Sequence, residues 1–145
     1  MNRSNPEKSV YWKHLAEKAM QSARNALFGY GILMALGLIF AFFTFQNTFY
    51  ADSPYVMGAL AIQGLLMAAM FGAGYYSFKD PVAGFRFGLI AIAVQGLVQL
   101  ISLRILGIIV VGIVAYYVYQ GYQQATQYYG DSKTKNDNIL DADLD

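Results

Sequence analysis

Four long apolar segments, separated by short polar gaps, constrain this chain more than any other feature of its sequence. They cover residues 26–49, 54–78, 81–102 and 105–124. About 20 helical residues cross the roughly 30 Å hydrocarbon core of a bilayer, and each segment is near that length or longer. Backbone polar groups in hydrocarbon must be satisfied internally, which favours helices. The pattern predicts an all-α membrane protein with a four-helix transmembrane domain over 26–124.

The low charge of the chain supports this interpretation. Charged residues make up 13% of the sequence and apolar residues 57%, whereas soluble domains carry about 25% charged residues. Too little polar surface remains to cover a soluble domain. The net charge of +1 also lacks the basic excess that is typical of nucleic-acid-binding domains. We therefore expect a membrane protein with no nucleic-acid partner.

Three breaks separate the predicted spans. Asp52-Ser53-Pro54 and Lys79-Asp80-Pro81 each place a capping side chain before a proline, which ends one helix and starts the next. The third break contains neither glycine nor proline. We place it at 102–104, because a single helix over 87–119 would be about 50 Å long and would hold Arg104 inside the membrane. Three spans with a long, bent last helix are the alternative.

The two ends of the chain differ in charge and in expected structure. Residues 1–25 hold five basic and two acidic side chains, and 130–145 hold five acidic and two basic ones. Apolar residues recur in 1–25 at spacings of three and four, which predicts an amphipathic helix in the membrane interface; a simple helical leader into the first span is the alternative. The leader and the apolar segment are too long for a cleaved signal peptide. The acidic tail 130–145 lacks periodicity and is predicted to be disordered, with a docking motif at Ile139-Leu140 as the alternative.

The basic residues favour one orientation in the membrane. With both termini cytoplasmic, nine of the ten Lys and Arg residues lie on the inner side and only Arg104 lies outside, in line with the positive-inside rule. The layout loosely resembles short four-span bacterial membrane proteins, which implies a bacterial inner membrane. Aromatic residues near the inner face are predicted to form an interfacial belt: Tyr11, Trp12, Tyr30, Tyr75, Tyr76, Tyr117 and Tyr119.

Small residues recur four apart within the spans, the spacing that lets helix backbones approach closely in a membrane. The spacing does not decide whether these residues pack within the bundle or against a partner. The candidate helix-packing positions are Gly64, Ala68 and Gly72 in the second span and Gly84 and Gly88 in the third.

Three glutamines form a candidate polar face. Gln95 and Gln99 share one face of the third span with Gly84 and Gly88. Gln63 and Gln95 lie at equal depth, both roughly 12 Å from the outer end of their spans. An unpaired amide in hydrocarbon costs up to several kcal/mol, so we expect these two side chains to hydrogen-bond across the helices. A polar ligand or ion path along this face is the alternative.

Chemistry-bearing residues are scarce. The chain has no cysteine and a single histidine, His14, and no acid lies inside an apolar segment. Catalysis in a membrane usually needs a nucleophile–base pair, coupled acids or a metal cluster. We therefore expect no enzyme activity, no metal site and no cofactor. Three residues at the expected interface are predicted to contact lipid or a partner: Arg86, Trp12 and Arg24.

Together these features predict a non-catalytic accessory or assembly subunit. It would pack against a membrane protein partner or form a homo-oligomer, with membrane lipids around it. A small channel or facilitator for a polar solute along the glutamine face is the alternative. Little on that face is polar below Gln95, so we expect no open pore in a single copy.

Overall fold

The computed structural model describes residues 6–46 and 53–142, which form four helices and no strand. Each helix contains a segment long and apolar enough to cross a membrane, so the prediction of four helices of membrane-spanning length is confirmed. α3 and α4 are separate helices, as the break at 102–104 predicts. The helices are α1 (Pro6–Gln46), α2 (Pro54–Tyr76), α3 (Pro81–Ile101) and α4 (Ile105–Ala142).

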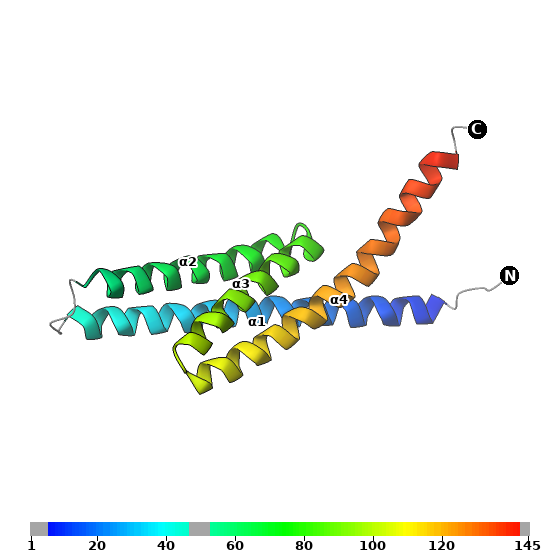
Figure 1. Ribbon diagram of the computed structural model, residues 1–145. Helices are drawn as coiled ribbons and strands as arrows, with labels where there is room; N and C mark the ends of the chain where they lie inside the picture. The colour runs from blue at the N-terminus through cyan, green and yellow to red at the C-terminus, as the bar shows by residue number, and fades with distance from the viewer. Residues whose placement is uncertain (1–5, 47–52, 143–145) are drawn as a thin grey trace.

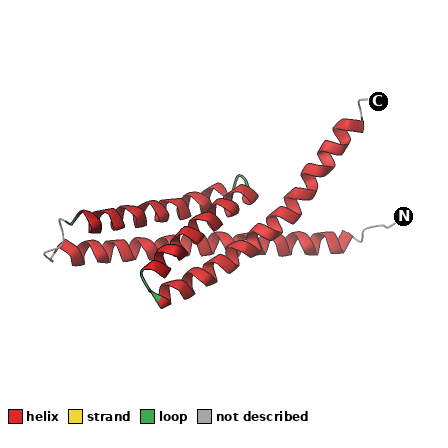
Figure 2. Ribbon diagram, in the orientation of Figure 1, coloured by secondary structure: helices red, strands yellow, loops and turns green. Residues whose placement is uncertain are grey.

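The helices form a bundle in which neighbours in the chain are neighbours in space (Figure 1). α1 contacts α2 and α4, and α3 also contacts α2 and α4, so the order around the bundle is α1–α2–α3–α4. α1 begins and α4 ends at the same end of the molecule (Figure 1). Figure 2 shows that the α2–α3 and α3–α4 connections are short.

α1 and α4 meet along a seam that combines small and larger apolar side chains. Buried residues recur on both helices at alternating spacings of three and four, the pattern of helices that cross at a shallow angle. Gly121 marks a close approach, because a Cβ there would overlap the Cβ of Ala23 and lie 3.4 Å from the carbonyl oxygen of Ala19. The buried residues of the seam helices are Ala16, Met20, Ala23, Leu27, Tyr30 and Met34 on α1, and Val111, Val114, Val118, Gly121 and Ala125 on α4.

The two proline-containing breaks start their helices at the predicted residues. The backbone N–H of Ala83 donates to the Asp80 carboxylate at 3.0 Å, so Asp80 caps α3. Ser53 occupies the corresponding position before α2, but its side chain makes no capping hydrogen bond. The backbone carbonyl of Ser53 instead accepts from the N–H of Val56 at 3.1 Å.

The third break ends α3 without a glycine. The N–H of Arg104 donates to the carbonyl of Gln99 at 3.1 Å, and that of Leu103 donates to the carbonyl of Leu100 at 3.1 Å. This is the Schellman arrangement, in which the residue after the helix adopts a left-handed conformation. Leu103 does so with φ of 52°, where a side chain costs about 1–2 kcal/mol. Glycine is the usual residue at this position, and its absence explains why the turn is inconspicuous in the sequence.

The structure differs from the expectations at both ends. α1 continues from Pro6 through the predicted junction near residue 25, and its apolar stripe, including Met20 and Ala23, is buried in the core. The interfacial position predicted for 1–25 is therefore not confirmed. α4 remains helical to Ala142, so the disorder predicted for 130–145 is not confirmed either. The expected span ends also shift, because α2 ends at Tyr76, α3 ends at Ile101, and residues 47–49 lie outside the described residues.

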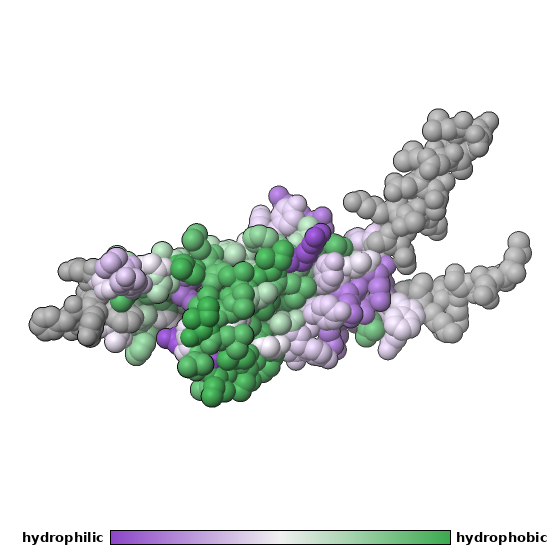
Figure 3. Space-filling view, in the orientation of Figure 1, coloured by the Kyte–Doolittle hydropathy of each residue, from purple (hydrophilic) through white to green (hydrophobic). Residues whose placement is uncertain are grey.

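Large apolar side chains lie exposed around the middle of the bundle. Leu36 and Phe40 on α1 and Leu106 and Ile113 on α4 are among them. Figure 3 shows hydrophobic residues gathered over the middle of one face, with more hydrophilic residues toward the end where α1 begins. In water, such an apolar surface would need a protein partner to cover it, whereas in a membrane the lipid tails cover it directly. The distribution indicates a multi-pass membrane protein.

Candidate functional site

The glutamines of the predicted polar face lie together. Gln95 Nε2 donates to Gln63 Oε1 at 3.3 Å and links α3 to α2, so the hydrogen bond expected from their equal depth is present. Gln95 is only 1% exposed, and Gln99 is half-buried one turn further along α3. The side chain of Tyr30 of α1 lies beside those of Gln95 and Gln99. Three helices therefore meet through polar side chains.

Two acceptors of this cluster are unused. No described residue donates a hydrogen bond to Oε1 of Gln95 or to Oε1 of Gln99, although both atoms are buried. The Gln99 amide also packs against Gly107 of α4, where a Cβ would overlap it. Each unpaired buried acceptor costs about 1–3 kcal/mol. The cluster therefore aligns the helices more than it stabilises them.

Apolar side chains occupy the α3 face between the glutamines and the other end of the helix. The side chain of Leu27 lies 3.1 Å from where a Cβ of Gly88 would be. Phe85 and Ile92 are buried on the same helix, while Arg86 is exposed. Along this face of the described residues, a single copy has no continuous polar path from Gln95 toward Arg86.

Gly84 and Gly88 face into the bundle. A Cβ on Gly84 would lie 2.5 Å from the backbone N and Cα of Ser77, in the turn after α2. Both glycines are buried, and both are close to parts of the same chain because they lack a side chain. The spacing of these glycines does not decide between packing within the bundle and packing against a partner. The structure shows that both glycines pack within the bundle.

Arg24 of α1 holds the turn between α2 and α3. Its Nε donates to Ser77 Oγ at 3.0 Å, and its Nη2 donates to the Ser77 carbonyl at 2.9 Å. The guanidinium carbon lies 4.4 Å from the centroid of the Phe78 ring, a cation–π distance. Ser77 Oγ in turn donates to the carbonyl of Gly74 at 2.7 Å. The sequence predicts a lipid or partner contact for Arg24, whereas these contacts lie within the chain.

The small residues of α2 face outward. A Cβ on Gly64 or on Gly72 would meet no atom within 4 Å, and Ala68 and Gly72 are exposed. Ala61, also exposed, continues the same face at helical spacing. We call Ala61, Gly64, Ala68 and Gly72 the outer stripe. Its two glycines leave the α2 backbone open to close approach from outside the bundle.

The remaining predicted contact residues lie on the surface. Trp12 of α1 and Arg86 of α3 are exposed, which suits a contact with lipid or with a partner. The part of the chain that the structure describes contains no group of three His, Asp or Glu side chains able to hold a metal ion. The described clusters can pack helices and form hydrogen bonds.

The chain matches no protein-family model, no curated protein and no solved structure. Its function has to be inferred from the contacts of its own residues.

Tyr30 and Ser77 belong to these clusters, and the sequence does not reveal either role. The sequence places Tyr30 in the interfacial belt, but the side chain is 6% exposed and lies beside the glutamines. The spacing of three between Leu27 and Tyr30, followed by four to Met34, is the signal that could have placed it in the core. Ser77 lies in a turn, where no periodicity marks a buried position.

Proposed function

We propose that this protein is a non-catalytic membrane subunit that assembles through the outer stripe of α2. The observation that carries the proposal is the outward direction of Gly64 and Gly72, whereas Gly84 and Gly88 pack inside the chain. In lipid, helices associate through the close packing of small residues and through interhelical hydrogen bonds. A stripe that the bundle does not use is available to another helix.

A second copy of the chain is the partner that the stripe fits best. In a two-fold symmetric contact, one surface patch packs against itself, so the patch must be self-complementary. Small residues at spacings of four, such as Gly64, Ala68 and Gly72, meet this requirement because the stripe positions themselves carry no side chain larger than a methyl group, although the exposed Leu65 and Tyr75 flank them. No residue of the outer stripe is charged, so no like-charge repulsion opposes the contact.

We place both termini on the cytoplasmic side of a bacterial inner membrane. The support is that α1 begins and α4 ends at one end of the bundle (Figure 1), and that eight of the nine Lys and Arg residues in the described part of the chain belong to helix segments or turns on that side. Cysteine labelling of Asp52→Cys and Arg104→Cys from outside the cell tests this orientation, together with a reporter fused after residue 145. We expect both thiols to react. An extracytoplasmic reporter would overturn the orientation.

A channel for a polar solute has less support. The two free amide oxygens of Gln95 and Gln99 favour it, but Leu27 fills the same face at Gly88. A solute that sheds its water needs polar groups along its whole path. The test is to measure solute flux in the wild-type protein and in Gln95→Leu. If Gln95→Leu abolishes the flux while the fold is retained, the channel function would be favoured over the assembly function.

Cross-linking tests the proposed contact directly. The chain has no cysteine, so one introduced thiol reports one position. Ala61→Cys lies on the outer stripe, and Ile113→Cys lies on an exposed face of α4. Under mild oxidation in membranes, we expect Ala61→Cys to give a dimer and Ile113→Cys to stay monomeric. A cross-linked product whose mass differs from that of a dimer would show that the partner is a different protein and not a second copy. If both variants stay monomeric, the proposal is overturned.

A matched pair of glycines sharpens this test. Gly72 and Gly112 both have open space where a Cβ would lie, so a leucine at either position leaves the chain's own packing intact. Gly72→Leu should hold two α2 helices apart and weaken self-association about tenfold, whereas Gly112→Leu should change it less than about twofold. Association constants from fluorescence energy transfer in liposomes measure both. Equal effects would contradict a contact through α2.

A further inference from the structure

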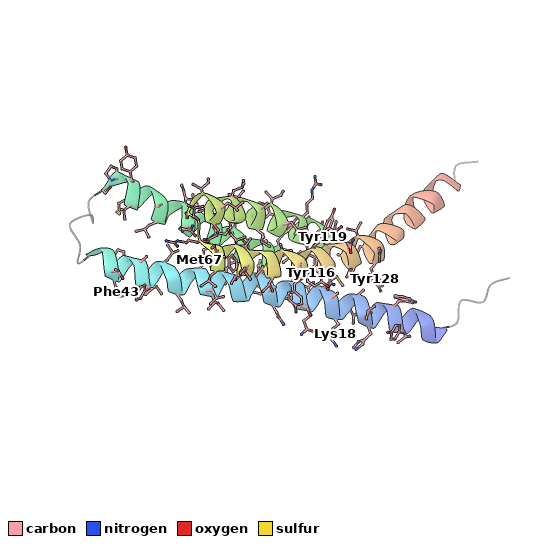
Figure 4. The ribbon with its side chains drawn as sticks, turned by 60° about the horizontal axis from the view of Figure 1, so that its bottom comes forward. Lys18, Phe43, Met67, Tyr116, Tyr119 and Tyr128 are labelled. Carbon is pink, nitrogen blue, oxygen red and sulfur yellow. The ribbon has the colours of Figure 1, made fainter. Side chains whose placement is uncertain are left out.

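A groove with a mixed lining, including the apolar Leu15 and Ala19 of α1, runs along one side of the α1–α4 seam. Its volume is about 440 Å³, and it lies beside the close contact of Gly121 with Ala23. Figure 4 shows Lys18 on α1 and Tyr116 on α4 where the two helices lie alongside each other. The polar side chains that line the groove are Lys18 and Ser22 of α1 and Tyr117, Gln120, Gln123 and Gln124 of α4.

The lining is rich in hydrogen-bond donors and carries a single charge, which is positive. Lys18 is the only ionic side chain that lines the groove, and the neighbouring Glu17 does not line it. Gln120 Nε2 donates to Tyr116 Oη at 2.7 Å, and Gln123 Nε2 donates to Tyr119 Oη at 3.0 Å. These bonds orient the two amides and leave each nitrogen a second hydrogen to donate. Such a set of donors around a cation suits an anion with several acceptor oxygens.

The depth of the groove matches the headgroup region of a bilayer. α4 is apolar from Ile105 to Val118 and becomes glutamine-rich from Gln120. At 1.5 Å per residue, Gln120 and Gln124 lie about 22 and 29 Å from the start of α4, so the groove reaches the inner end of a hydrocarbon core about 30 Å thick. The groove therefore lies where apolar surface gives way to polar surface, toward the hydrophilic end visible in Figure 3. Phosphate groups of lipids lie at this level.

We propose that this groove binds a phosphate group. Lys18 would neutralise its charge, and the hydroxyls of Ser22 and Tyr117 and the amides of the glutamines would donate hydrogen bonds to its oxygens. An anionic lipid presents such a group at this depth, and free phosphate has the same chemistry. The groove lies between α1 and α4, whereas the outer stripe lies on α2, so binding here is independent of the proposed self-assembly.

Binding to the full chain in neutral detergent, measured by native mass spectrometry, tests the proposal. The probes are a short-chain phosphatidylglycerol, a diacylglycerol of the same chain length without phosphate, and inorganic phosphate. Removing one cation at a membrane surface is expected to weaken phosphatidylglycerol binding about fivefold in Lys18→Gln. Lys13→Gln, an exposed cation on the same helix that does not line the groove, should change it less than about twofold.

The outcomes separate the two sources of phosphate. If inorganic phosphate displaces phosphatidylglycerol, the groove recognises the phosphate alone; if only the lipid binds, it recognises a headgroup. Both results support the site, provided that Ser22→Ala also weakens binding and that circular dichroism shows unchanged helix content. Equal binding of diacylglycerol and phosphatidylglycerol would overturn the proposal. An equal loss in Lys13→Gln and Lys18→Gln would overturn it as well.

Discussion

α2 and α3 carry small-residue stripes of the same spacing, but only one of the two is used within the chain. On α3, Gly84 and Gly88 lie against Ser77 and Leu27. On α2, Gly64 has open space where a side chain would be. The difference teaches that such a spacing shows that a helix can pack closely, whereas the rotation of the helix about its own axis decides which neighbour it packs against.

The hydrogen bond between Gln63 and Gln95 accounts for the two rotations. Gln95 shares a helix face with Gly88, so turning Gln95 toward α2 turns that glycine inward as well. Gly64 follows Gln63 directly in the sequence, and successive residues are about 100° apart around a helix. Turning Gln63 toward α3 therefore turns the outer stripe away from the bundle. The orientation of this polar pair agrees with the orientation of both stripes.

The largest expected effect comes from a substitution in the inward stripe, which consists of Gly84 and Gly88 of α3. In Gly84→Ala, the new Cβ would lie 2.5 Å from backbone atoms of Ser77, which cannot give way as a side chain can. We expect the free energy of unfolding to fall by about 3 kcal/mol, the upper range for overpacking. Gly88→Ala meets the flexible end of Leu27 at 3.1 Å and lies at ordinary contact distance, 3.5 Å, from the Cβ of Ala73, so it should cost about 1 kcal/mol. Unfolding in mixed micelles measures both, and equal losses would contradict the close approach at Ser77.

A smaller effect is expected when Arg24 loses its hydrogen bonds to Ser77 in the turn between α2 and α3. Arg24→Met keeps much of the side-chain bulk but removes both hydrogen bonds to Ser77. Hydrogen bonds to a charged group contribute about 1.5–3 kcal/mol, so we expect a loss of about 2 kcal/mol in the same unfolding assay. Lys13→Met, at an exposed position of α1, is the control and should be nearly neutral. A neutral Arg24→Met would show that the turn does not depend on this contact.

The smallest effect concerns the outer stripe of α2. Here the free energy of unfolding is expected to rise. Gly72→Ala adds a methyl group into open space within α2, and alanine favours a helix over glycine by about 0.5–1 kcal/mol. The monomer should therefore become more stable by this amount. A loss of stability measured at protein concentrations too low for association would mean that Gly72 packs inside the bundle after all.

The parts of the fold that could be predicted depend on position along the chain. The four spans follow from bilayer thickness, the start of α3 follows from the Asp80-Pro81 cap, and the pairing of Gln63 with Gln95 follows from depth. Span length, the position of a cap and the depth of a residue along its span can each be found by counting residues along the chain. The Leu103 turn is predicted because a longer helix would not fit the membrane and would hold Arg104 inside it.

The parts that could not be predicted depend on rotation and on contacts distant in the sequence. Large apolar side chains lie on both the buried and the exposed sides of these spans, so the hydrophobic pattern does not show whether the small residues of α2 face inward or outward. The contact of Arg24 with Ser77 joins two polar residues that both look suited to a membrane surface. For the same reason, the stripe that contains Met20 and Ala23 could be read as facing lipid, although it is buried in the core.

The seam between α1 and α4 sets an order of events during synthesis. α1 enters the membrane well before Gly121 leaves the ribosome, so the contact between Ala23 and Gly121 can form only after the last helix inserts. α2 and α3, joined by a short turn and by their glutamine pair, can associate as soon as both have been inserted. Closure of the ring by α4 is then the final step of folding. A chain halted before that step would present the bare side of α1 to the quality-control proteases of the membrane.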